Sequence, residues 1–217
     1  MIFEKYSDLE GMHAFLSPSQ PHWLRYDDDK LRERYLKSLA VQRGTELHEF
    51  ANKAITLSIP LPRNKNCLNQ FVNDVIGYNM SSEQKLFYNG FCFGTADAID
   101  YRKNRLRIYD LKTGETEAHM DQLKVYAALF CLNYQNLVRQ ARSDGRSDND
   151  IARKYGLKPA ELHFDPKQMT DIELRIYQYA EVREEHPDPE EIRDIMDIIV
   201  HEVEVLKDVK AEGIVNE

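Results

Sequence analysis

Two short segments carry the acids and the lysine that could do chemistry together. Residues 93–97 read FGTAD and residues 109–114 read YDLKTG. If Lys103 and Asn104 form the tip of a hairpin between them, antiparallel partners have numbers that sum to 207, and Asp97 lies opposite Asp110. Carboxylates paired in this way repel each other unless a cation lies between them. Lys112 follows two residues after Asp110 and therefore shares its face.

This arrangement predicts a site of hard oxygen ligands for Mg²⁺ or Mn²⁺, with a lysine beside it. A metal of this kind suits phosphodiester hydrolysis, because it polarises the phosphate and lowers the pKa of a bound water. The lysine could orient that water or stabilise charge on the phosphate. The plainer interpretation is a surface hairpin with an incidental pair of acids. A slip of one residue would also move Asp97 to the wrong face, with Asp100 as the spare candidate.

The elements that must position these residues follow from hydrophobic periodicity. Asn89-Gly90 and Lys103-Asn104 are typical of hairpin turns. The first strand is expected to pair with the second, whose residues Phe91, Phe93, Thr95, Asp97 and Ile99 are predicted on one face. The expected order is helices over 27–39, 41–57 and 67–78, strands over 85–88, 91–100 and 106–112, helices over 118–140 and 148–155, a strand over 171–179, and a last helix from 188. This order predicts an α/β fold with a mixed central sheet flanked by helices.

Composition is that of an ordinary globular protein. The chain has 217 residues, 42% of them hydrophobic and 30% charged, and a formal net charge of -8. The stretch 181–217 holds 13 acids and 4 bases, so the rest of the chain is close to neutral and could present a basic face to a polyanion. The acidic tail is expected to pack over the sheet, away from DNA.

The cysteine content and the hydropathy of the chain indicate in which cellular compartment the protein is expected. Cys67, Cys92 and Cys131 are far apart and odd in number, which indicates neither a zinc site nor a disulfide framework. A reducing cytoplasm is the simplest expectation, the host cytoplasm if the chain is encoded by a phage. The longest apolar run, residues 125–132, is too short to span a bilayer, so no membrane partner is expected.

The motifs resemble the RecB-type nuclease branch of the PD-(D/E)XK superfamily. The resemblance rests on three pieces in order: GTAD at 94–97, DLKTG at 110–114 and QLKVYA at 122–127. It is close from His48 to Ala127 and looser over 172–185. The resemblance implies a restriction-endonuclease-like core and one nuclease domain over 1–217. Its parts would be a helical part over 1–80, the catalytic hairpin and helix over 81–140, an insertion over 141–170, and the late strand with the acidic helix over 171–217.

The resemblance also implies roles for individual residues. The catalytic set would be Asp97, Asp110, Lys112, Gln122 and Tyr126. The metal ligands would be His48, Asp97, Asp110 and the backbone carbonyl of Leu111, with Glu83 as a weaker candidate. DNA contacts would come from Arg43, Gln122, Tyr126, Arg139 and Arg142. The plainer interpretations are a satisfied core histidine for His48, a solvated strand-end acid for Glu83, and a half-buried helix face for Gln122 and Tyr126.

The chain departs from some relatives in the family. Asp97 follows Ala96 where the superfamily name has proline, and the four cysteines of an iron–sulfur cluster are absent. No phosphate-binding loop is present, so neither a cluster nor ATP is expected. The resemblance is therefore to compact phage exonucleases, with Mg²⁺ or Mn²⁺ as cofactor and DNA as partner, in recombination or repair. A single-strand annealing or recombination protein is a further candidate partner.

Two other functions stay open on the same residues. One is a non-catalytic module that binds DNA ends or protein, such as a recombination accessory or counter-defence factor. The other is a sequence-specific endonuclease, which would usually need a dimer and an element that reads bases. The polarity of digestion, the strand preference, the number of metals and the oligomeric state do not follow from the sequence.

Overall fold

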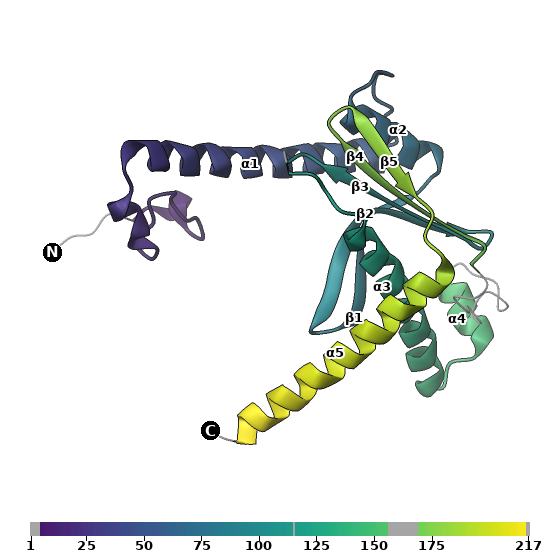
Figure 1. Cartoon of the computed structure of the whole chain (residues 1–217). Helices are drawn as coiled ribbons and strands as arrows, with labels where there is room; N and C mark the ends of the chain where they lie inside the picture. The colour runs from purple at the N-terminus through teal and green to yellow at the C-terminus, as the bar shows by residue number, and fades with distance from the viewer. Residues whose placement is uncertain (1–4, 115, 156–168, 216–217) are drawn as a thin grey trace. The chain divides into compact units, whose positions relative to one another are not determined.

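A mixed five-stranded sheet carries the residues predicted to do chemistry (Figure 1). The computed structural model describes residues 5–114, 116–155 and 169–215. The strands lie in the sheet in chain order: β1 (Ser81–Asn89), β2 (Cys92–Arg102), β3 (Arg105–Lys112), β4 (Asp171–Gln178) and β5 (Glu181–Glu185). Only β3 and β4 run parallel; the other neighbours are antiparallel. The prediction of an α/β fold with a mixed sheet is confirmed.

Helices cover both faces of this sheet. Helix α3 (Asp121–Ser143) packs on one face, and α5 (Pro189–Val215) packs chiefly on α3. Their shared core includes Leu123, Ile108 and Ile192, all fully buried. On the other face lie α2 (Cys67–Gly77) and the end of α1 (Asp28–Thr56).

The second core is built from smaller and aromatic residues. Ala51 and Ala54 of α1 and Val72 and Val75 of α2 belong to one buried cluster with Tyr109 of β3. Tyr109 donates a hydrogen bond to the buried Glu173 of β4 on this side of the sheet. A buried carboxylate needs such partners, and Arg107 Nε supplies another at 3.2 Å.

The chain divides into two compact units, Met1–Glu46 and Leu47–Glu217. The described part of the first unit contains two 3₁₀ turns, η1 (Ser7–Leu9) and η2 (Pro21–Arg25), and the beginning of α1. Trp23 donates a hydrogen bond to the Ser17 carbonyl, and the rings of Phe15 and Tyr35 meet edge to face at 5.1 Å. No residue is fully buried in the described part of this unit, 5–46. The single domain predicted over 1–217 stays a prediction.

Several predicted elements differ from the observed ones. The helices expected over 27–39 and 41–57 are one helix, α1, because neither a proline nor a cap interrupts residues 39–41. Strand β1 starts at Ser81, four residues before the expected start, and β5 was not expected. Helix α4 (Asp148–Tyr155) has the predicted bounds. Residues 156–168 of the predicted insertion lie outside the described residues.

The acidic tail forms a regular helix with the predicted start. The Glu190 amide donates to Asp188 Oδ1 at 2.8 Å, which is the expected N-cap. The helix packs chiefly on α3, so the prediction that it packs over the sheet named the wrong neighbour. Among the described residues, no helix has the length and the apolar character that crossing a bilayer requires.

Candidate metal centre

The β2–β3 hairpin has the predicted register. Its pairs run from Arg102 opposite Arg105 to Ala98 opposite Tyr109, and their numbers sum to 207. Lys103 and Asn104, the two turn residues, both have positive φ, as a tight hairpin turn requires. The next position along would pair Asp97 with Asp110, and here the paired ladder stops. The Leu111 amide donates a hydrogen bond of 2.9 Å to Asp97 Oδ2. A side-chain oxygen therefore accepts from a backbone amide at the point where the paired ladder stops.

The face prediction for β2 is wrong at this same point. Ala96 and Ile99 both belong to the core under α3, whereas Ala98 belongs to the core under α2. Strict alternation would place Ala96 and Ala98 on one face, so the alternation is interrupted around Asp97. Phe93, predicted on the same face as Ile99, is 67% exposed. The interruption is what allows Asp97 to lie beside residues of α1.

Three side chains from three elements meet at this interruption. Ligand atoms of His48 on α1, Glu83 on β1 and Asp97 on β2 all lie within 4.8 Å of one another, and this group could hold a metal ion. His48 Nδ1 is 3.4 Å from Asp97 Oδ2. One turn after His48, Asn52 accepts a hydrogen bond of 2.7 Å from the Ser82 hydroxyl, which fixes α1 against β1. The predicted ligands His48, Glu83 and Asp97 are therefore brought together.

Glu83 has an uncommon backbone. Its φ is +50°, although it is neither glycine nor asparagine. The neighbouring pairs Ser82 with Ala98 and Gln84 with Ala96 would place Glu83 opposite Asp97, but no pair forms there. A left-handed conformation costs a non-glycine residue about 1–2 kcal/mol, and such outliers cluster at functional sites. Here the conformation brings a third ligand into the group.

The pKa of the Asp97 carboxyl is higher than usual for an aspartate. Burial raises its pKa to about 6, and the charges of Asp110 and Glu83 act in the same direction. The charge of His48 and the hydrogen bond from the Leu111 amide oppose this rise. A cation would relieve the cost of ionising Asp97, because a nearby positive charge favours the charged form.

Asp110 has a buried oxygen that lacks a hydrogen bond. The residue is 3% exposed, and its Oδ2 accepts no hydrogen bond within the part of the chain that is described. Lys112 Nζ lies 3.0 Å from this oxygen and forms an ion pair with it. The charge of Asp110 also raises the pKa of Asp97, so the two carboxylates repel each other, and a cation would relieve this repulsion.

Lys112 is held by a chain of side chains on α3. Its Nζ donates to Gln122 Oε1 at 2.7 Å, and Gln122 Nε2 donates to the Tyr126 hydroxyl at 3.0 Å. Gln122 and Tyr126 are one turn apart on the helix, as predicted. Gly94 makes room for the last of them, because a Cβ there would lie 2.8 Å from Tyr126 Cε1. The motif did not predict this close approach between Gly94 and the Tyr126 ring.

The remaining predicted site residues are placed differently. The Leu111 amide faces Asp97, and a strand residue directs its N–H and C=O to the same neighbour, so its carbonyl is directed toward β2 as well. Arg139 and Arg142 lie near the end of α3, about 25–30 Å along the helix from Gln122. Arg142 is already paired with Asp148 at 2.9 Å. The structure does not bring these two arginines to the acids. Arg43 is exposed in the first unit.

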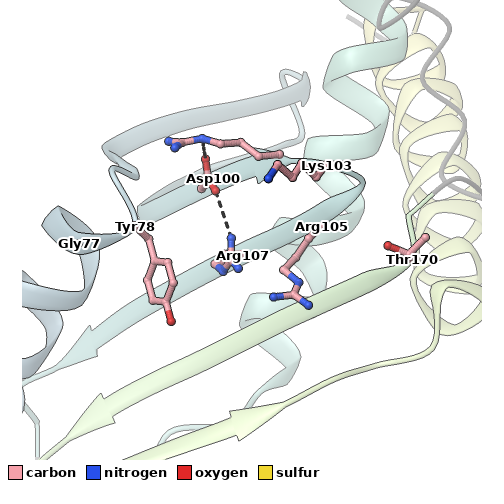
Figure 2. A pocket seen from close by; sticks show the side chains of 8 residues that line it. Gly77, Tyr78, Asp100, Lys103, Arg105, Arg107 and Thr170 are labelled. Carbon is pink, nitrogen blue, oxygen red and sulfur yellow. Dashed lines mark hydrogen bonds and ion pairs between the residues drawn. The ribbon is translucent and has the colours of Figure 1, made fainter.

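A cationic pocket lies at the other end of the β2–β3 hairpin (Figure 2). Its volume is about 500 Å³, and Arg102, Lys103, Arg105 and Arg107 line it. Asp100, the spare acid of the sequence analysis, belongs to this pocket and pairs with Arg102 at 2.8 Å and with Arg107 at 3.4 Å. The confirmed register therefore removes Asp100 from the candidate metal ligands.

The group that could hold a metal ion combines the His48 imidazole with the Glu83 and Asp97 carboxylates, and Asp110 with its partner Lys112 is not a member of that group. The motifs and the family resemblance were sufficient to find all of these side chains, but they gave no sign of the left-handed Glu83 or the contact between Gly94 and Tyr126. No protein-family model matches this chain, and no curated protein matches it either. What the chain shows is an α/β fold with a mixed sheet and an acidic and histidine group that could hold a metal ion.

Proposed function

We propose that this chain is a metal-dependent nuclease that hydrolyses the phosphodiester bonds of DNA, acting on ends. The observation that carries the proposal is the group of His48, Glu83 and Asp97, whose ligand atoms lie within 4.8 Å of one another. Lys112 pairs with the buried Asp110 at 3.0 Å, and the charge of Asp110 acts on Asp97. The choice of DNA and of ends rests on the motif resemblance to compact phage exonucleases.

The donor set fits a divalent cation. Carboxylate oxygens suit Mg²⁺ and Mn²⁺, and an imidazole shifts the preference toward Mn²⁺. His48, Glu83, Asp97 and Asp110 would hold the ion, with the Leu111 carbonyl as a further oxygen. When bound, such an ion supplies polarisation of the phosphate and a water of lowered pKa.

The residues of the chain then have distinct tasks. Lys112 presents a fixed positive charge beside the acids, where it can orient a water or stabilise charge developing on the phosphate. Gln122 keeps the Lys112 ammonium in place through its carbonyl oxygen, and Tyr126 in turn holds the Gln122 amide. Asp97 binds a cation in its ionised form, so the proton that its raised pKa of about 6 favours competes with the metal as the pH falls.

The test is a cleavage assay on two substrates. The full chain is incubated with end-labelled linear DNA and with covalently closed circular DNA, in Mg²⁺, Mn²⁺ or EDTA. Asp110→Asn and Lys112→Ala are compared with two control variants, Asp121→Asn and Lys103→Ala, which change an exposed acid and an exposed lysine. We expect metal-dependent loss of the linear DNA alone, faster in Mn²⁺, and its abolition by the first two variants only.

Other outcomes would revise the proposal in defined ways. Cutting of the circle under the same controls would make the protein an endonuclease. DNA binding without cleavage in either metal would contradict the proposal and favour the non-catalytic module. Equal activity of Asp110→Asn and the parent chain would remove this centre from the reaction. A recombination or annealing partner stays a prediction, which co-purification with candidate proteins would test.

A further inference from the structure

Two exposed phenylalanines lie side by side on the β1–β2 hairpin. Phe87 and Phe93 are direct cross-strand partners, and their ring centroids are 6.4 Å apart with planes 33° from parallel. The residues are 54% and 67% exposed. Apolar rings of this size are normally buried, so a pair of exposed rings indicates a binding surface.

The two rings share a face with the candidate metal centre. Leu86 is buried in the core under α3, and residues next to it in the strand point to the other face. Gly94 lies against Tyr126 of α3, so Phe93 points away from α3 as Phe87 does. The end of α1, which carries His48, packs on the face opposite α3 as well. The β1–β2 hairpin therefore presents the rings on the face of the His48, Glu83 and Asp97 group.

One cross-strand pair separates the rings from that group. Lys85 and Thr95 are partners midway between Phe87 and Glu83. Lys85 is exposed and forms no ion pair with any residue in the described ranges. The four residues from Glu83 to Phe87 span about 13 Å. Metal ligands, a free cation and two aromatic faces thus follow one another along one surface.

The chemistry of this row fits a polynucleotide strand. Aromatic rings stack on the bases of single strands and a lysine neutralises a phosphate, and stacking tolerates any sequence. At the rise of a duplex strand, 3.4 Å per nucleotide, about four nucleotides would reach from the centre to the rings, and an extended single strand would need fewer. A protein partner fits less well, because two rings offer roughly 300–500 Å² and a stable interface needs about 800 Å² from each partner.

We propose that Phe87 and Phe93 are a stacking platform for unpaired bases, with Lys85 on the phosphate between the platform and the metal centre. This inference rests on the proposed function, and it specifies the substrate as a strand that is single-stranded beyond the scissile bond. In a duplex the bases are stacked on each other, and the rings cannot reach their faces.

Binding without cleavage tests the platform separately from the reaction. The probe is a fluorescent oligothymidylate of about 12 nucleotides, titrated in EDTA with the full chain and followed by anisotropy. The Phe87→Ala/Phe93→Ala double variant is compared with Phe91→Ala, which removes another exposed phenylalanine at the turn of the same hairpin. We expect the double variant to bind the oligonucleotide about 10-fold more weakly than the parent chain, and Phe91→Ala to bind it less than twofold more weakly. For a blunt duplex of equal length, the double variant should lose less than twofold in affinity.

A second variant reports stacking directly. The chain has a single tryptophan, Trp23, so Phe87→Trp adds an indole whose emission the oligonucleotide should quench. Unchanged emission, equal weakening by Phe91→Ala, or undetectable binding of the oligonucleotide by the parent chain would each overturn the platform. Cleavage with an unaffected double variant would leave the proposed function standing without the platform. Stacking without cleavage in any metal would support the platform and contradict the proposed function.

Discussion

At the scale of single residues, the centre is defined by what its side chains lack. Asp110 Oδ2 is buried without a hydrogen bond, and burial and acidic neighbours raise the pKa of Asp97 to about 6. Both features are unfavourable in a protein without a ligand, and both are relieved by the same cation. Lys112 is positioned beside Asp110 and supplies a positive charge to the centre.

The raised pKa of Asp97 predicts a proton-linked affinity for metal. The folded-state pKa of about 6 lies above the ordinary value of 3.8, so ionisation costs stability as pH rises through this window. The Asp97→Asn variant should therefore stabilise the metal-free protein at pH 7.5, by at most about 3 kcal/mol, and should do little at pH 4. Conversely, Mn²⁺ should raise the melting temperature of the parent chain more at pH 7.5 than at pH 5.

Differential scanning fluorimetry across pH, with Mn²⁺ or with EDTA, measures both effects. The Asp121→Asn variant is the matched control, since its carboxyl is exposed at the start of α3. If Mn²⁺ stabilised the parent chain equally at both pH values, Asp97 would not be a ligand.

At the scale of elements, the centre depends on a close approach between a strand and a helix. Gly94 of β2 touches the Tyr126 ring of α3, and the chain of hydrogen bonds from Tyr126 through Gln122 ends at Lys112 of β3. The separation of the strand and the helix therefore controls where the lysine lies.

Gly94→Ala should push the Tyr126 ring away and displace Lys112. A displacement of about 1 Å at a catalytic group can lower the rate by about 100-fold, and we expect a loss of about 10- to 100-fold in kcat. The fold should survive, because the Tyr126 side chain is only half-buried and can move. The comparison is with Gly90→Ala in the same hairpin, where a Cβ meets nothing within 4 Å.

The measurement is cleavage of linear DNA beside the melting temperature of each variant. A full-rate Gly94→Ala enzyme would show that the tyrosine contact does not position the lysine.

The elements also show how far the sequence leads. The hairpin register was predictable, because a two-residue turn at Lys103 and Asn104 fixes every pair that follows. The motifs named Asp97, Asp110, Lys112, Gln122 and Tyr126, whereas His48 and Glu83 were expected from the family resemblance. The change of face around Asp97 was not predictable, because the sequence pattern of alternating apolar residues is the same in a regular strand and in an interrupted one. Strand β5 was missed because its residues 181–185, EVREE, carry only one apolar side chain.

At the scale of the whole molecule, the acidic C-terminal helix supplies part of the main core. Ile192 is fully buried and Val203 is 2% exposed, both in the cluster under α3. The acids that give the chain much of its net charge lie on a helix whose other side is structural.

Truncation after Ala180 should therefore unfold the Leu47–Glu217 unit. It removes β5 and α5, and losing several buried side chains at about 2–5 kcal/mol each exceeds the usual stability of a domain. We expect no cooperative thermal transition in circular dichroism. Truncation after Lys207 is the control, because residues 208–211, the part of the removed segment whose burial is described, are all exposed. A folded and active chain that ends at Ala180 would contradict the structural role of α5.

The parallel pairing of β3 with β4 has a consequence for the time at which this protein becomes active. Every residue of the candidate centre, from His48 to Tyr126, is synthesised before β4, which β3 needs as its second neighbour. Paired residues such as Arg107 and Glu173 are 66 positions apart, which takes a ribosome roughly 3–13 s to cover. A chain interrupted in that interval would carry the complete motif on a strand with one open edge. If the protein cuts DNA, we expect a copy that ends before β4 to be inactive, because β3 would lack its second neighbour.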